Sequence, residues 1–272
     1  MTVRIGLSGW TYAGWRGVFY PPKLPQKREL AYAASQVNSI EINGTFYSLQ
    51  RPSSFERWRD ETPDDFLFAV KGPRFLTHMK KLVGVEAALA NFFASGILAL
   101  NDKLGPVLWQ LPATFKFDAG RMAAFFALLP RDTAQARTLA RRHEPRMAGR
   151  AYLKIDENRP LRHALEPRHD SFIEPASLEL LRRHNIAMVA ADSSRWARYH
   201  ADTADFAYAR LHGGEETYVS GYDDKQLREW ARWVRRASKD GRDVFVYFDN
   251  DAKVRAPADA VALLRLLDLV TA

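Results

Sequence analysis

The sequence contains no cysteine, and this absence excludes three kinds of chemistry. Disulfide bonds, zinc sites built from thiolates and a cysteine nucleophile all need the missing side chain. The chain also has no apolar run near the roughly 18 residues that a membrane-spanning helix needs. Its opening stretch, MTVRIGLSGW, lacks the charged-then-apolar layout of a signal peptide. We therefore expect a cytoplasmic protein with no membrane partner.

The composition is that of a folded globular protein. Of the 272 residues, 47% are hydrophobic and 26% are charged, close to the averages of about 45–50% and about 25%. The length suits either two small domains or one closed α/β barrel of about 250 residues. Because no internal repeat or low-complexity linker divides the chain, we predict a single domain over residues 1–272.

Positive charge is in excess. Lys and Arg number 40 against 32 Asp and Glu, which gives a net charge of +8 and favours an anionic partner. Much of the excess is arginine on two apparently helical stretches, 137–150 and 228–242. Such faces are usually solvated, and without interleaved aromatics they are weak evidence for nucleic acid. A non-catalytic nucleic-acid-binding protein is one alternative function.

Strand and helix patterns alternate along the chain. Eight short β-rich runs are separated by amphipathic stretches with helix signals, for example at 52–63, 85–100, 175–185 and 223–241. The eight runs are 4–9, 37–43, 66–71, 106–112, 163–168, 186–192, 206–212 and 244–250. This alternation predicts one (β/α)8 barrel of the TIM type, with a doubly wound sheet as the runner-up. The long segment 131–161 predicts an extra helical excursion between strands four and five.

Residues 38–47, NSIEINGTFY, place Glu41 between Ile40 and Ile42 in a predicted strand. Neighbouring side chains in a strand point to opposite faces, so Glu41 faces the barrel interior if the isoleucines face the helices. The same alternation in the other strands predicts a ring of polar residues at the C-terminal mouth, where barrels bind ligands. The ring comprises Ser8, Glu41, Asn43, Lys71, Gln110, Glu166, Arg168, Arg210, His212 and Asn250, with Asp192 at the end of strand six.

The cations of this ring predict a small anionic ligand, either phosphorylated or resembling a nucleotide or sugar. Lys71, Arg168 and Arg210 together resemble an anion clamp, and they need counter-charge beyond the carboxylates that the ring supplies. We expect Asn43, Gln110 and His212 to hold phosphate or hydroxyl groups. An aromatic ring, from Trp10 or Tyr47, is expected to stack on the ligand.

Two interpretations of the glutamates remain open. Glu41 and Glu166, on strands two and five, could serve as base and acid in metal-independent hydrolase or isomerase chemistry. In the competing interpretation both stay ionised and only pair with cations, Glu41 with Lys71 on the neighbouring strand and Glu166 with Arg210 or Arg168.

A divalent-metal site is a further alternative. The mouth contains the ligand types of metal-dependent barrel endonucleases and isomerases, namely His78, Glu166, His169, Asp192, His212 and Glu41. Lys71, Arg168 and Arg210 would repel a dication there, and no HxH or HExxH spacing occurs. We therefore predict no metal and no other cofactor.

Several long motifs resemble one family. SGWTYAGWRGVFYPPKLP, SIEINGTFYSLQRPSSFERWRDETPDDFLFAVKGP, THMKKL, LWQLPATF, ALEPRHDSF and VYFDND are similar to the YecE-like family, also called domain of unknown function 72. The resemblance spans nearly the whole chain and implies a (β/α)8 barrel, but it implies no established activity. A similarity of this family to barrel endonucleases that bind damaged DNA is an analogy of fold, and the chain lacks the histidine-rich spacing of a multi-zinc nuclease site.

Overall fold

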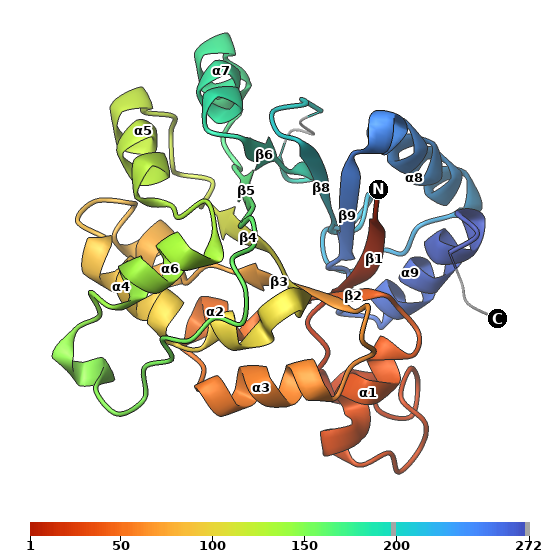
Figure 1. The fold of residues 1–272 in the computed structure, drawn as a ribbon. Helices are drawn as coiled ribbons and strands as arrows, with labels where there is room; N and C mark the ends of the chain where they lie inside the picture. The colour runs from red at the N-terminus through yellow and green to blue at the C-terminus, as the bar shows by residue number, and fades with distance from the viewer. Residues whose placement is uncertain (197–199, 270–272) are drawn as a thin grey trace.

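The strands form one parallel sheet that closes on itself. In this computed structural model, which describes residues 1–196 and 200–269, nine strands follow the order β6-β5-β4-β3-β2-β1-β9-β8-β7. They are β1 (Val3–Ser8), β2 (Ser39–Ile42), β3 (Leu67–Lys71), β4 (Leu104–Gln110), β5 (His163–Glu166), β6 (Ile186–Met188), β7 (Ala190–Asp192), β8 (Phe206–Leu211) and β9 (Asp243–Phe248). The first and last strands of that order, β6 and β7, are separated only by Val189, so the sheet closes into a barrel (Figure 1).

Helices surround the barrel (Figure 1). They are α1 (Glu29–Ala34), α2 (Gly44–Tyr47), α3 (Pro52–Asp60), α4 (Glu86–Ala94), α5 (Ala119–Leu128), α6 (Thr133–Ala140), α7 (Pro175–Arg183), α8 (Asp224–Ala237) and α9 (Arg255–Leu266). The predicted helices at 52–63, 85–100, 175–185 and 223–241 are confirmed as α3, α4, α7 and α8. Among the described helices, none is both long enough and apolar enough to cross a membrane.

Local sequence signals explain where several helices begin. Pro52 and Pro175 occupy the first turns of α3 and α7, where a missing backbone N–H costs nothing. Before α8, the Asp223 side chain accepts a hydrogen bond from the Gln226 N–H, and the Gln226 side chain accepts one from the Asp223 N–H. This reciprocal arrangement is a capping box.

The TIM-type barrel is confirmed, with its sixth strand in two parts. β6 pairs with β5, whereas β7 pairs with β8. The Thr203 hydroxyl accepts a hydrogen bond from the Met188 N–H and donates one to the Ile186 carbonyl. The Thr203 side chain thereby replaces a strand partner along β6, which explains why the predicted run 186–192 does not form one strand.

The predicted excursion between the fourth and fifth strands is also confirmed. After α5, the chain forms α6 and a short helical turn at Pro145–Met147 before it enters β5. Helix α6 packs against α4, and the Tyr152 N–H donates to the Ala94 carbonyl at the end of α4. The excursion therefore lies against the outer layer of helices and does not enter the barrel.

The buried apolar side chains form two clusters, one between the strands and the helices and one inside the barrel. The larger cluster lies between strands and helices and includes Ile40, Ile42, Val70 and Leu165. The smaller cluster fills the barrel itself with small side chains from some strands and aromatic rings from β8 and β9, namely Ala69, Leu108, Ala164, Ala187, Val189, Ala191, Phe206, Tyr208, Phe245 and Tyr247. This inner plug supports the polar residues at the C-terminal ends of the strands.

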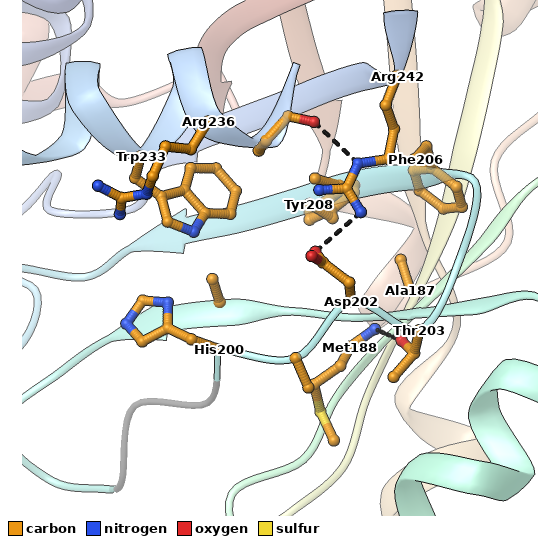
Figure 2. Close-up of a pocket in the computed structure, with 14 residues that line it drawn as sticks. Ala187, Met188, His200, Asp202, Thr203, Phe206, Tyr208, Trp233, Arg236 and Arg242 are labelled. Carbon is orange, nitrogen blue, oxygen red and sulfur yellow. Dashed lines mark hydrogen bonds and ion pairs between the residues drawn. The ribbon is translucent and has the colours of Figure 1, made fainter. Parts of the chain in front are cut away.

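A cavity of about 330 Å³ lies along the seam, by which we mean the boundary between β6–β7 and β8 (Figure 2). Its lining includes Phe206 and Tyr208 of β8 and Trp233 of α8. Arg242 closes one side by pairing with Asp202 at 2.8 Å. The cavity involves the N-terminal halves of its strands, and none of the predicted site residues lines it. Because barrel enzymes bind substrates at the opposite end, we do not assign the site there.

Candidate functional site

Arg210 of β8 is the centre of the polar layer above the inner plug. Its side chain is fully buried and contacts three carboxylates at once. It donates to Glu41 from Nη2 at 2.9 Å and from Nε at 3.1 Å, to Glu166 from Nη1 at 2.8 Å, and to Asp249 from Nη2 at 2.9 Å. A guanidinium suits this role because it presents five donors in a fixed plane.

Glu41 has no free acceptor position facing the mouth. Besides the two bonds from Arg210, its oxygens accept from the Ser8 hydroxyl at 2.6 Å and the Tyr208 hydroxyl at 2.6 Å. Its side chain is fully buried. The carboxylate is therefore placed inside the barrel, as the strand alternation predicted, but it pairs with Arg210 instead of with Lys71.

Glu166 at the end of β5 is held in the same way. It accepts from the Gln110 side chain at 2.7 Å and from Arg210, while His212 Nε2 lies 2.8 Å from its other oxygen. Burial alone would raise the pKa of the Glu166 carboxyl, but the nearby charges, chiefly Arg210 and Arg168, hold this pKa well below its usual value. Glu166 is thus a permanently ionised partner at neutral pH.

We expect Tyr208→Phe to lower the free energy of unfolding by about 1–3 kcal/mol, because the Glu41 carboxylate then loses one buried donor while the phenyl ring still fills the plug. Chemical denaturation at pH 7 measures this change. Tyr47→Phe is the matched control, since Tyr47 is 68% exposed and should change stability by less than about 0.5 kcal/mol. Equal effects of the two substitutions would contradict the role of the Tyr208 hydroxyl.

Lys71 at the end of β3 lies beside this network without joining it. Only 7% of the residue is exposed, yet its ammonium makes no hydrogen bond or ion pair with any residue that the structure describes. Its Nζ lies 4.5 Å from the centre of the Phe46 ring. Burial, and then the Arg210 charge, lowers the pKa of Lys71 to about 8, although the nearby carboxylates act in the opposite direction.

Arg168 and three rings form a further part of the mouth. The Arg168 guanidinium lies 4.0 Å from the centre of the Trp196 ring and donates to the Tyr218 hydroxyl at 3.0 Å. Its contact with Glu166 is longer, at 3.5 Å, and its buried Nε has no partner among the described residues. The His212 ring stands edge-on to both Trp196 and Tyr218. Arg168 and Trp196 also line an open cavity of about 400 Å³.

The cations make one side of the mouth electropositive. His78 lies there, with its ring 5.2 Å from the Phe46 ring. Burial lowers the pKa of His78, and the charges of Arg168, Lys71 and Arg74 lower it further. The charges of these three residues therefore all act on the His78 imidazole, which stays neutral at pH 7.

The acids lie on another side, at the end of β9. Asp249 pairs with Arg210, and its Oδ2 lies 3.0 Å from His212 Nδ1 without the alignment of a hydrogen bond. Despite burial, the Arg210 charge and His212 hold the pKa of Asp249 well below its usual value. Two residues on, burial and the Asp249 charge raise the pKa of Asp251 to about 6.

Some residues predicted for the mouth lie elsewhere. In β9 the alternation passes through Tyr247 to Asp249, so Asn250 faces outward and donates to Asp259 of α9. Asp192 likewise faces α8, where it accepts from the Trp230 ring N–H. An error of one residue at the end of a strand moves a side chain to the other face. Asp249 was missed for this reason, and it gives the mouth three carboxylates for its three predicted cations.

The two aromatics predicted to stack on a ligand differ in exposure, since Trp10 is partly buried and Tyr47 is exposed. Trp10 packs edge-on against Trp58 of α3 and lines a cavity with residues of α1 and α3, so its ring lies against the helical layer. Tyr47 is exposed on α2, close to Arg74, and lies at the rim. The rings that border the mouth cations are Phe46, Trp196 and Tyr218. Their only sequence signal is that they follow the second, sixth and seventh predicted strands.

The other predicted residues surround these groups. Asn43 donates from its side chain to the Ser8 hydroxyl at 2.8 Å, and its buried side-chain oxygen has no partner among the described residues. The Gln110 side-chain amide donates its hydrogen bond to Glu166. Over residues 1–196 and 200–269, no group of three or more His, Asp or Glu side chains is arranged to hold a metal ion.

Comparisons with known proteins agree with the fold. A family profile described as "Protein of unknown function DUF72" matches residues 4–272. UPF0759 protein YunF of Bacillus subtilis is 23% identical over 300 aligned positions, which span 98% of this chain and 95% of YunF. UPF0759 protein YecE of Escherichia coli K12 is 31% identical over 113 residues, 42% of this chain and 39% of YecE.

Solved structures show the same likeness. The crystal structure of a DUF72 family protein from Thermotoga maritima superposes with a TM-score of 0.77 at 25% identity, over 98% of this chain and 100% of that one. A DUF72 family protein from Enterococcus faecalis gives a TM-score of 0.74 at 16% identity, over 100% and 97% of the two chains. These similarities support the barrel, and none of the names states an activity.

Proposed function

The chain belongs to the DUF72 family, as its motifs predicted, and from this premise we propose that its barrel mouth binds a small phosphorylated or carboxylated ligand through Lys71 and Arg168. The single observation that carries the proposal is the unused hydrogen-bonding capacity of these two cations. Lys71 has no hydrogen-bond partner among the described residues, and Arg168 leaves its buried Nε unpaired. A buried donor such as the Arg168 Nε normally finds a partner, and an anion that contacts both Arg168 and Lys71 would supply it.

Other features of the mouth support a polar ligand. The unpartnered oxygen of Asn43 can accept from a ligand hydroxyl, and Asp251 is half-buried nearby on the acidic side. The ligand would then place its anionic group between Lys71 and Arg168 and its hydroxyls toward β2 and β9. This polarity fits a sugar phosphate or a hydroxy acid better than a ligand that is charged at both ends.

The structure changes the roles that we assign to the remaining predicted residues. Arg210 is fully buried and engaged with three carboxylates, so in this proposal it holds the network together and does not contact the ligand. Glu41 and Glu166 have all four oxygens committed to donors. We therefore prefer the interpretation in which both only pair with cations over the one in which they transfer protons.

Calorimetric titration with inorganic phosphate at low salt tests the proposal. We expect Lys71→Met and Arg168→Gln each to weaken phosphate binding about tenfold or more, because each removes one charge-assisted contact of about 1.5–3 kcal/mol. Lys80→Met is the matched control, since Lys80 also lies over a phenylalanine ring, Phe75, but is exposed. Unchanged phosphate affinity in both mouth variants would refute the proposal.

The same proteins distinguish the nucleic-acid alternative. If the arginine-rich segment 137–150 and the basic face of α8 bind DNA, the affinity for a random duplex should fall steeply with salt, and Lys71→Met should bind as tightly as the wild type. If the mouth is the binding site, phosphate should compete and the duplex should bind weakly. Duplex binding that is unchanged by added phosphate would favour the nucleic-acid alternative.

A further inference from the structure

Two buried lysines of this chain have opposite surroundings. Lys103 is 5% exposed and donates to the Arg59 carbonyl at 2.6 Å and the Thr62 carbonyl at 2.8 Å. Lys71 is 7% exposed and has no oxygen partner among residues 1–196 and 200–269. Lys103 is therefore held by two backbone carbonyls, whereas the Lys71 nitrogen has no such bond to break before it reacts.

The position of Lys71 also favours its neutral form. A desolvated lysine next to another cation is the arrangement that turns an amine into a nucleophile. Lys71 is desolvated by the barrel and by the Phe46 ring, and the Arg210 charge acts on it from within the mouth. With a pKa of about 8, about a tenth of the Lys71 side chains are unprotonated at pH 7.

The groups around Lys71 suit a reaction with a carbonyl compound. Arg168 can keep the anionic group that the proposed site places between the two residues, while a Lys71 side chain that has lost its proton bonds to the carbonyl carbon of the same ligand. His78 stands edge-on to the same Phe46 ring and is neutral at pH 7, so it can accept and return a proton. No step in such a reaction needs an oxidant or a reductant.

We propose that Lys71 forms a covalent imine with a small aldehyde or ketone that carries a phosphate or carboxylate group. The Lys71 nitrogen bonds to the carbonyl carbon, and the carbonyl oxygen takes up a proton to give a carbinolamine. The carbon–oxygen bond then breaks, the two hydrogens of the amine leave with that oxygen as water, and a carbon–nitrogen double bond remains. This inference rests on the proposed anion site and names the class of its ligand.

Reductive trapping tests the inference. The whole protein is incubated with pyruvate or with glycolaldehyde phosphate and sodium cyanoborohydride, and its peptides are mapped by mass spectrometry. We expect a modified Lys71 whose mass has increased by that of the probe less one oxygen atom, with at least tenfold less modification at Lys103 and at the exposed Lys80. Labelling of Lys71 should rise with pH to about 8 and then level off, whereas ordinary exposed lysines gain reactivity up to about pH 10.4.

Two variants separate this inference from the proposed function. Lys71→Arg keeps a cation in the mouth, so it should still bind inorganic phosphate but give no adduct at residue 71. Lys103→Arg should be labelled at Lys71 like the wild type. If the wild type binds phosphate but Lys71 is modified no faster than Lys80, the imine is refuted and the anion site stands. If neither phosphate binding nor an adduct is found, both proposals fail.

Discussion

Arg210→Met is expected to destabilise the protein by about 3–5 kcal/mol or more, the largest effect of any single substitution proposed for this chain. The substitution leaves Glu41, Glu166 and Asp249 in the barrel without the cation that they share. Removing one partner of a buried ion pair costs about this much because the remaining charge is neither solvated nor compensated. Denaturant unfolding at pH 8 measures the loss.

The pH dependence of this loss has a definite sign. In the wild type the pKa values of Glu166 and Asp249 are lowered, so their contribution is present above their unfolded-state pKa values near 4 and is lost as the pH falls toward the folded-state values. Without Arg210 the dominant influence on these carboxyls is burial, which raises a carboxyl pKa. The destabilisation by Arg210→Met should therefore be smaller at pH 5 than at pH 8.

Matched variants keep this prediction testable. Arg162→Met removes a partly exposed arginine that pairs with Asp243 at 2.7 Å, and it should cost no more than about 1 kcal/mol. If Arg210→Met does not fold at pH 8, Arg210→Lys provides the measurement, because it keeps the charge and loses the fork of donors. Similar stability losses in Arg210→Lys and Arg162→Met would contradict the central role of Arg210.

Lys71→Met is expected to raise the free energy of unfolding by about 3 kcal/mol at pH 7. The difference between the ordinary lysine pKa of 10.5 and the value of about 8 in the barrel corresponds to about 3 kcal/mol that the protonated side chain costs the folded state. Methionine has a similar shape and carries no charge. A substitution that stabilises the fold while it weakens ligand binding is typical of a functional site.

The sign of the pH effect follows from proton counting. Between about pH 8 and 10.5 the unfolded chain binds more protons at Lys71 than the folded protein does, so the stability of the wild type rises with pH in this window. The advantage of Lys71→Met should be complete below pH 8 and should disappear by about pH 10.5. Thermal or denaturant unfolding of both proteins at pH 7 and pH 10 measures it.

Lys103→Met is the control for this prediction because Lys103 is as deeply buried and is hydrogen-bonded. Its removal leaves the Arg59 and Thr62 carbonyls without their donor, so we expect a loss of about 1–3 kcal/mol. The two lysine-to-methionine substitutions should thus have opposite signs. A destabilisation by both would show that Lys71 is tied down in the folded protein.

The predictable part of the site follows from a rule that acts within one strand. Strand side chains alternate with a period of two, and this places Glu41, Lys71, Glu166, Arg210 and His212 in the barrel interior at one end, where the structure has them. The rule fails only where the strand ends, at Asp192 and Asn250, because a shift of one residue changes the face. The division of the sixth strand could not be predicted, since it depends on the hydroxyl of Thr203, more than a dozen residues away.

The sequence by itself determined the closed barrel, its helical excursion and the polar level at its mouth, because these depend on periodicity and on the order of elements. Only the tertiary structure decided which charges are paired. Arg210 reaches Glu41 across 169 positions of the chain, and its fork of donors engages the carboxylate that one of the two sequence interpretations paired with Lys71 on the neighbouring strand. Contacts within 4 Å depend on how the strands are arranged around the barrel, and that arrangement left Lys71 buried and without a hydrogen-bond or ion-pair partner in the part of the chain that the structure describes.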